Sequence, residues 1–244
     1  DVQDQNEQTV TITVAREDHV YMRFNSAELA LSIDEISKRY IEPAMSVLIS
    51  GVEADYIAFA TKATANLAGT AGTAITDLVV PGAARAKLNQ GLAPKNGSRM
   101  VQMESVAMGS LVNGLKGLFQ DSTQIKEQYR EGMMGRTAMA DWYENDRMWT
   151  MPNSADVAGE INAGTLTSGI TAITVDGFSA APVAGMVFTI EGTYEVHPET
   201  KVAFAHLKQF VVTSATTTTI NFSPACIYAT TNPLQNCSGA PTDN

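Results

Sequence analysis

The longest periodic pattern in the chain lies between Ser32 and Asn66, where apolar residues recur at spacings of three and four. This spacing predicts a long amphipathic helix. Ser32 and Glu35 form a capping box at its start, in which the hydroxyl accepts from the Glu35 amide and the carboxylate reaches back to the Ser32 amide. At about 1.5 Å per residue the helix would extend roughly 50 Å, so it needs support along its length.

Two lines of apolar residues run along this predicted helix. The first comprises Ile33, Ile36, Tyr40, Ala44, Val47, Gly51, Ala54 and Ala58, and the second comprises Ile41, Met45, Leu48, Val52, Tyr56 and Phe59. Together they form a wide apolar arc, which predicts that several layers pack on the helix and bury it. A coiled coil would show a narrower seam. Pro43 predicts a kink or two consecutive helices, because it removes a donor and crowds the carbonyl of Arg39.

A β-hairpin is predicted ahead of the helix. Thr9–Val14 alternates threonine with valine or isoleucine, Arg16, Glu17 and Asp18 form a polar turn, and Val20–Phe24 alternates again. A hairpin alone is only marginally stable in water. Its strands therefore need partners, and another chain can provide them.

The middle of the chain mixes strands and helices. Strands are predicted at Ile75–Val80 and Arg99–Met103, and helices at Pro81–Gln90, Val106–Phe119 and Ile125–Arg130. The following segment, Met133–Met151, concentrates methionine and both tryptophans. Such a segment fills a core more often than it forms a binding face, so we interpret it as core.

The composition changes from Asp156 onward, where charge becomes sparse and threonine, alanine and glycine dominate. Short strands are predicted at Ile170–Val175, Met186–Ile190, Gln209–Val212 and Thr218–Phe222, separated by turn residues. This pattern predicts a small all-β unit, either a barrel or a sandwich. A domain boundary is expected near Pro152–Asp156.

Composition and charge exclude several classes of function. The chain has 244 residues, a formal charge of -10 and a pI near 4.7. A protein that binds nucleic acid through its phosphates needs clustered lysine and arginine side chains, and no such cluster is visible in the sequence. Because no uninterrupted apolar run reaches about eighteen residues, we expect no membrane span. No secretory signal is visible, and the first residue is Asp1, so we expect a processed or partial product.

Few residues of the sequence form a catalytic or metal-binding pattern. The segment Gly109–Lys116, GSLVNGLK, departs from a phosphate loop in its residues and in its context. His197 and His206 lie nine residues apart and read as surface or structural residues. Cys226 and Cys237 read as two thiols, with a disulfide as the alternative. Glutamates at four-residue intervals, Glu191, Glu195 and Glu199, read as a solvated edge. The expectation is therefore no enzyme, no cofactor and no metal.

Several long motifs resemble one protein family. They are RYIEPAM (Arg39–Met45), ARAKLNQGLAP (Ala84–Pro94), SLVNGLKGLF (Ser110–Phe119), QIKEQYREGMMGRTAMADWYEND (Gln124–Asp146) and VFTIEGTYEVHPETK (Val187–Lys201). In this order they resemble the major capsid (coat) proteins of short-tailed, podovirus-type bacteriophages whose subunit carries an inserted β-domain. The resemblance covers most of Ser32–Thr213.

The resemblance implies an α+β fold of the Johnson (HK-97-like) type, shared by the capsid proteins of tailed phages and herpesviruses. Residues 1–31 would be the returning part of an extended β-hairpin loop, and residues 32–67 the long spine helix. Residues 68–155 would be peripheral and axial capsid sequence, and residues 156–244 the inserted all-β domain. The family's N-terminal arm and its return to the axial domain would lie outside this sequence.

The function implied is that of a structural protein that self-assembles into the icosahedral head of a tailed phage and encloses double-stranded DNA. Its partners would be copies of itself in pentamers and hexamers, scaffolding and portal proteins, and DNA bound without sequence-specific contact, with no membrane. It would assemble in the host cytoplasm and reside in the virion. Intersubunit contacts are expected at Arg16, Glu17, Asp18, Tyr21 and Arg23.

Two alternatives from other classes remain. The threonine-rich β-unit could be an adhesion or binding module of a phage or bacterial surface, holding a ligand or a host glycan. A hydrolase with a noncontiguous site would require a pocket that brings His197 or His206 within hydrogen-bond reach of a carboxylate.

Overall fold

The computed structural model describes residues 13–14, 16–23, 33–115, 134–152, 159–164 and 166–242. Their fold is mixed α+β, as predicted. The helices are α1 (Ile33–Ile36), the π-helical turn η2 (Ser37–Ile41), α2 (Glu42–Ala63), α3 (Val79–Gln90) and α4 (Ser105–Leu115). The strands are β1 (Met100–Met103), β2 (Arg136–Thr137), β3 (Ala140–Glu144), β4 (Glu160–Ile161), β5 (Ile170–Asp176), β6 (Val187–Val196), β7 (Ala203–Ala215), β8 (Thr219–Cys226) and β9 (Cys237–Ser238). The chain divides into two compact units, residues 1–53 and 54–244.

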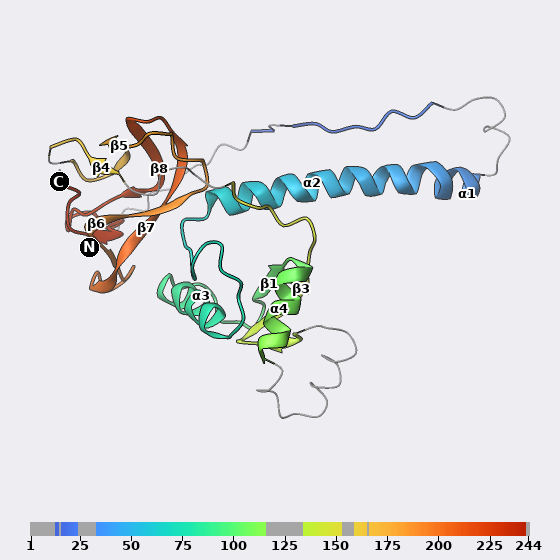
Figure 1. The fold of residues 1–244 in the computed structure, drawn as a ribbon, viewed down its shortest axis with the longest axis horizontal. Coiled ribbons are helices and arrows are strands. Elements are labelled where there is room, and N and C mark those ends of the chain that lie inside the picture. Colours follow the sequence, from blue (N-terminus) through green and yellow to red (C-terminus); the bar gives the residue numbers. More distant parts are fainter. Residues whose placement is uncertain are drawn as a thin grey trace, which may run out of the picture. The chain divides into compact units, whose positions relative to one another are not determined.

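The predicted long helix is confirmed as the consecutive elements α1, η2 and α2, and α2 is the longest helix drawn in Figure 1. Pro43 predicts a kink or two consecutive helices, and the structure has consecutive helical elements, with the π-helical turn Ser37–Ile41 ending two residues before Pro43. There the amide of Glu42 donates to the carbonyl of Ser37, five residues back. A π-helical turn is wider than an α-helical turn, which gives the proline ring more room beside the carbonyl of Arg39.

The prediction that the apolar arc of this helix is buried is wrong for the single chain. Ile57 is the one buried residue in α2, all of which the structure describes. Val47 is 71% exposed and Phe59 is 72% exposed. A three- and four-residue period shows that apolar side chains line up along a helix. It does not show that the same chain covers them.

The predicted β-hairpin is not formed within the described residues. Residues 16–23 contain no strand, and all of their side chains are exposed. Most of the first predicted strand, Thr9–Ile12, lies outside the described residues, as does Phe24. An alternating pattern makes a segment suitable for a sheet, but a strand exists only where a neighbour completes the ladder.

The strand predicted at Ile75–Val80 is wrong, because α3 begins at Val79. A carboxylate oxygen of Asp77 accepts a hydrogen bond of 2.9 Å from the amide of Val79 and so satisfies one of the free donors at the start of the helix. Ile75 and Leu78 are partly buried against the core of the neighbouring sheet. Tertiary packing explains the apolar run here without a strand.

A three-stranded sheet and α4 form the first core. The sheet has the order β1-β3-β2, with β1 parallel to β3 and β2 antiparallel to it, and β1 confirms the strand predicted at Arg99–Met103. The core consists of Met103, Met108, Leu111, Leu115, Met134 and Trp142. The indole nitrogen of Trp142 donates to the carbonyl of Thr137 at 3.0 Å.

The core interpretation of the methionine-rich segment is confirmed for Met134 and Trp142, which are buried. Met139 and Met151 remain partly exposed. Of the two helices predicted after β1, α4 confirms the first part of Val106–Phe119. The helix predicted at Ile125–Arg130 lies outside the described residues.

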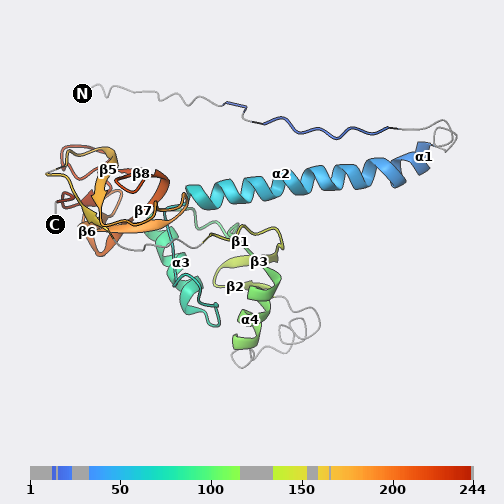
Figure 2. The same ribbon diagram turned by 45° about the horizontal axis from the view of Figure 1, so that its top comes forward.

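The second core belongs to a curled sheet of six strands in the order β4-β5-β8-β7-β6-β9. Figure 2 labels four of these strands, β5, β6, β7 and β8. All of its pairs are antiparallel. Phe188, Phe210 and Phe222 meet in this core at ring-centroid distances of 5.1 to 5.8 Å. The four predicted strands are confirmed as β5, β6, β7 and β8. The residues after Gly159 therefore have a core of their own.

Two glycines of α4 provide a test of the first core. A Cβ atom at Gly114 would collide with the backbone carbonyl of Thr76, whereas one at Gly109 would meet nothing within 4 Å. We expect Gly114→Ala to lower the free energy of unfolding by about 1–3 kcal/mol through overpacking. Gly109→Ala should raise it by about 0.5–1 kcal/mol because alanine favours the helix.

Urea unfolding followed by the fluorescence of the buried Trp142 measures both variants. Equal unfolding midpoints for Gly114→Ala and Gly109→Ala would contradict the predicted contact between α4 and the segment around Thr76.

Candidate functional site

The predicted contact residues lie in an extended, exposed segment, residues 16–23, which we call the arm. The guanidinium of Arg16 donates to a carboxylate oxygen of Asp18 at 2.6 Å. Tyr21 is 88% exposed, and its ring contacts the ring of His19 edge-on at 4.4 Å. Glu17 and Arg23 are also exposed. All side chains of residues 16–23 are exposed to solvent.

The first unit also carries exposed apolar side chains on α2 and the turn before it. Ile41, Met45, Ile49 and Val52 are 42%, 47%, 58% and 50% exposed. Their spacings of four, four and three place them on one side of the helix, and we call this set the helix surface. Monomeric proteins rarely leave large contiguous apolar patches exposed, and those they expose often bind partners. The helix surface is therefore a candidate interface.

The helix that carries this surface also meets the length and composition expected of a membrane span. Residues Ser37–Ala63 form 27 residues with a hydropathy of 1.2. Glu53 and Asp55 lie within this helix. A charged residue near the bilayer centre costs about 2.5–3.5 kcal/mol on insertion scales, so two carboxylates oppose insertion. The expectation of no membrane partner stays a prediction.

In the second unit, Glu195 on β6 is the centre of a polar cluster with residues of β7. One carboxylate oxygen lies 3.0 Å from Nε2 of His206, and the other accepts from the ammonium of Lys208 at 2.8 Å. The side chains of Glu195 and Lys208 are 19% and 13% exposed. Burial alone would raise the pKa of Glu195, but the hydrogen bonds and charges of Lys208 and His206 outweigh it. The pKa is lowered.

Lys87 of α3 extends toward the same part of β7. Its ammonium donates to the side-chain carbonyl of Gln209 and to the backbone carbonyl of Leu67. The same oxygen of Gln209 accepts from the amide of Leu67 at 2.9 Å. Burial lowers the pKa of Lys87, and the charge of Glu195 partly opposes this. These contacts attach α3 and the segment before it to the six-stranded sheet.

The interpretation of the three spaced glutamates is therefore wrong at one position. Glu191 and Glu199 are exposed, as expected for a solvated edge. Glu195 is paired and mostly buried. A signal for this was available in the sequence, because His206 and Lys208 alternate and so share one face of a strand. The sequence does not show that this face meets Glu195, because that depends on the register of β6 against β7.

The histidine geometry required by the hydrolase alternative is present in part. His206 lies within hydrogen-bond reach of Glu195. Neither residue lines the cavity described below. His197 stabilises a turn, because its Nδ1 accepts from the amides of Glu199 and Thr200. Among the described residues, no group of three or more histidine, cysteine, aspartate or glutamate side chains is placed to hold a metal ion.

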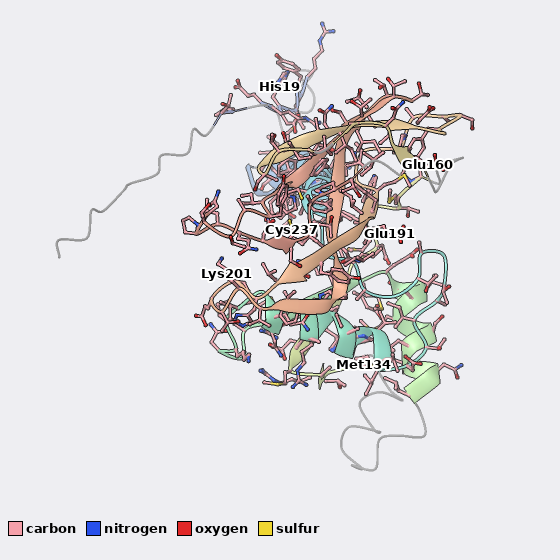
Figure 3. The ribbon with its side chains drawn as sticks, turned by 90° about the vertical axis from the view of Figure 1, so that its left-hand side faces the viewer. His19, Met134, Glu160, Glu191, Lys201 and Cys237 are labelled. Carbon is pink, nitrogen blue, oxygen red and sulfur yellow. The ribbon has the colours of Figure 1, made fainter. Side chains whose placement is uncertain are left out.

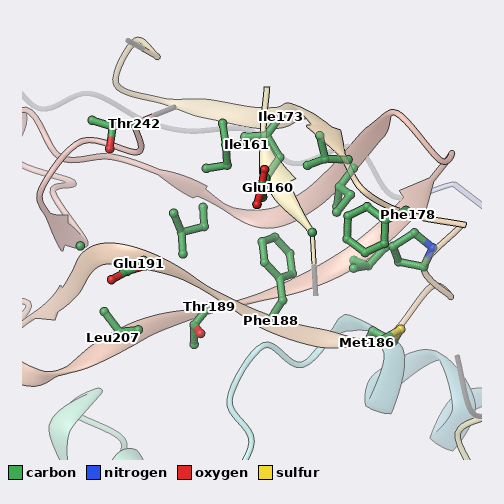
Figure 4. Close-up of a pocket in the computed structure, with 17 residues that line it drawn as sticks. Glu160, Ile161, Ile173, Phe178, Met186, Phe188, Thr189, Glu191, Leu207 and Thr242 are labelled. Atoms are coloured by element: carbon green, nitrogen blue, oxygen red, sulfur yellow. The ribbon is translucent and has the colours of Figure 1, made fainter. Parts of the chain in front are cut away.

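A cavity of about 700 Å³ opens on the curled sheet of the second unit. Figure 4 shows the ring of Phe188 and the side chains of Ile161 and Ile173 around it, with Phe178 at one end and Glu191 at the other. The lining is dominated by aliphatic and aromatic residues. Its volume falls in the usual range for small-molecule sites. Glu160, Glu191, Thr189 and Thr242 add polar groups to this lining.

No protein-family model matches this chain, and no curated protein matches it. The fold and surfaces therefore define its class by themselves. It is an α+β protein with an exposed arm, an exposed helix surface and a curled sheet with its own core. We call this sheet, strands β4 to β9, the β-unit.

The Glu195 cluster predicts a pH dependence. A carboxylate whose pKa is lowered by folding stabilises the protein above its unfolded pKa, near 4.5, and this contribution is lost as the pH falls through the folded pKa. Glu195→Gln should therefore lower the stability of the β-unit at neutral pH by about 1–3 kcal/mol. The loss of stability between neutral and acidic pH should shrink in the variant.

Hydrogen exchange of peptides from β6 and β7, measured at several pH values, tests this. Glu199→Gln is the matched control, because Glu199 is exposed in the turn after β6. An acid response that is the same in wild type and Glu195→Gln would refute the assigned role of Glu195.

Proposed function

We propose that this chain is a shell-forming structural protein, the major capsid subunit of a tailed bacteriophage, which self-assembles into an icosahedral head around double-stranded DNA. The resemblance of its motifs to coat proteins supports this proposal. So do two features of the first unit, the arm and the helix surface. The proposed finer fold is the Johnson type, with α1, η2 and α2 as its spine helix.

The single observation that carries the proposal is the exposure of the helix surface. Burying an apolar side chain completely contributes roughly 1.5–3 kcal/mol of free energy. Covering these four half-exposed side chains would therefore contribute several kcal/mol more. The total stability of a domain is only about 5–15 kcal/mol. A partner that covers the helix surface would therefore contribute substantially to the stability of the assembly. In a shell, that partner is another copy of the chain.

The arm suits the same role. An extended segment can add as a strand to the edge of a neighbour's sheet through backbone hydrogen bonds. When such a contact joins different surfaces of two copies, it is heterologous, and repeated contacts of this kind close into rings. Rings of five and six subunits tile an icosahedral shell. Intersubunit contact of Arg16, Glu17, Asp18, Tyr21 and Arg23 is thus part of the proposal.

The β-unit fits the proposed inserted domain. Its core residues, which include Ile173, Phe210 and Phe222, form a cluster separate from the core around Trp142. A segment with its own core can be inserted in a subunit without rebuilding the host domain. The net charge of -10 suits a protein that encloses DNA without sequence-specific contact. Scaffolding and portal proteins are the further proposed partners, the virion the proposed location and the host cytoplasm the site of assembly.

A second candidate function follows from the cavity. The β-unit could be a binding module for an apolar small molecule, because the cavity has a suitable size and lining. This role does not need assembly. A protein that binds apolar ligands and stays monomeric at every concentration would favour the module over the shell.

A charge on the helix surface tests the shell directly. Ile49→Asp should leave the folded chain intact, because Ile49 is 58% exposed. It should abolish particles, because the carboxylate would be buried against a neighbouring subunit. Electron microscopy of purified protein counts particles, and circular dichroism checks the fold. Val79→Asp is the matched control, since Val79 is 73% exposed in the first turn of α3, where a carboxylate is favourable.

If wild type and Ile49→Asp form particles equally well, the helix surface is not an assembly interface. If the wild-type protein never forms rings or shells, the proposed function is wrong.

The arm allows an independent test. Replacing Arg16, Glu17 and Asp18 together by alanine should leave the melting temperature unchanged, because all three side chains are exposed. The yield of particles should fall. Calorimetry of the unassembled chain and sedimentation of particles separate the two effects. A melting temperature that drops in step with the yield would show that the arm acts in folding instead.

A further inference from the structure

The only two cysteines of the chain lie in contact within the β-unit. Sγ of Cys226, the last residue of β8, is 3.3 Å from Sγ of Cys237, the first residue of β9. Both residues are completely buried and belong to the core with Phe210 and Phe222. They are separated by eleven positions in the sequence. Figure 3 labels Cys237 on the six-stranded sheet.

Backbone contacts hold the two cysteines together. The carbonyl of Ile227 accepts from the amides of Asn236 and Cys237, at 3.0 and 3.2 Å. The side chain of Asn236 accepts from the amide of Ile227 at 3.1 Å and donates to the carbonyl of Ala225 at 2.7 Å. The residues next to both cysteines are thus fixed by four hydrogen bonds. These hydrogen bonds hold the backbone beside each cysteine in place, and so keep the two sulfur atoms close.

A buried thiol usually acts as a small apolar side chain, and one such thiol would need no further explanation. Two thiols in contact, each beside backbone groups held by hydrogen bonds, meet a further condition, because a disulfide can form without backbone movement only where the two sulfurs are already close. We propose that Cys226 and Cys237 are a site of reversible disulfide formation, with a small-molecule disulfide such as oxidised glutathione as the co-reactant. This inference does not depend on the proposed assembly.

The reaction balances in two exchange steps. The thiolate of Cys237 attacks one sulfur of the small disulfide, forms a mixed disulfide and releases one small thiolate, which takes up a proton. Cys226 then loses its proton, attacks the Cys237 sulfur and displaces the second small thiol. The two protein thiols lose two electrons and two protons in total, and the small disulfide gains them.

Cys237 is the better first nucleophile. The hydrogen bond from the thiol of Cys226 lowers the pKa of Cys237, and the positive charge of Lys208 acts in the same direction. The same contact and burial raise the pKa of Cys226. Cys237 also lies in an edge strand of two residues, so the opening that admits the small disulfide involves few ladder bonds.

The bond would fasten the edge of the sheet. β9 pairs with β6 at two positions, Ser238 with Tyr194 and Cys237 with Glu195. A disulfide to the end of β8 would close a loop through residues 227–236 and limit the freedom of that loop in the unfolded chain. The oxidised β-unit should therefore unfold at higher urea concentration than the reduced one.

Equilibration of the full chain in glutathione redox buffers tests the proposal. After acid quenching, intact mass and thiol labelling give the oxidised fraction. We expect the folded chain to reach half oxidation at a reduced-to-oxidised glutathione ratio at least about tenfold more reducing than the chain in urea, because folding holds the two sulfurs together. The product should be a monomer that has lost two hydrogen atoms. Equal or weaker oxidation of the folded chain would overturn the proposal.

Single replacements provide the matched controls. Cys226→Ala and Cys237→Ala should each retain one thiol and lose no hydrogen atoms, and the oxidation-dependent rise of the urea midpoint should vanish in both. A midpoint that rises equally in wild type and the variants would count against the site. Disulfide-linked dimers of the wild type would also count against it. The mass measurement on wild type needs no variant, so it stands even if a replacement prevents folding.

Discussion

The constraint on which the rest depends is the burial of apolar side chains, which the described residues achieve in two cores but not along the long helix. Ile57 of α2 is buried, whereas Met45, Ile49 and Val52 are about half exposed. Intrinsic helix propensity alone rarely stabilises a helix in water, and packing usually provides the rest. In the proposed assembly, neighbouring subunits would cover the apolar side chains that the described residues of the chain leave exposed.

In the second unit, apolar side chains are buried within the chain itself, in two separate cores. Around Trp142, α4 and a small mixed sheet bury methionine and leucine side chains. In the β-unit, one curled antiparallel sheet buries phenylalanine, isoleucine and valine side chains. Each core has its own set of residues, and contacts such as that of Lys87 with Gln209 join their surroundings. This arrangement lets the β-unit keep its fold whatever the role of the helix surface.

Electrostatics within the β-unit follow from strand pairing. Glu191, Glu195 and Glu199 look equivalent in the sequence, yet only Glu195 is paired with both a histidine and a lysine within the described structure. The register of two neighbouring strands decides which carboxylate is enclosed. A second pairing, that of β6 with β9, places Cys237 beside the end of β8. Neither the ion pair nor the thiol contact follows from local spacing.

The sequence by itself determined the long helix, its irregularity before Pro43, and the strands β5 to β8, because helical and strand periods are local properties of neighbouring residues. Only the tertiary structure decided that the apolar arc is exposed, that Ile75–Val80 forms no strand, and that the described residues 16–23 contain none. It also decided the partners of Glu195 and Cys237. These outcomes depend on which segments, distant in the sequence, come into contact. A residue pattern shows which side chains are apolar and share a face, but it does not show which other residues cover that face.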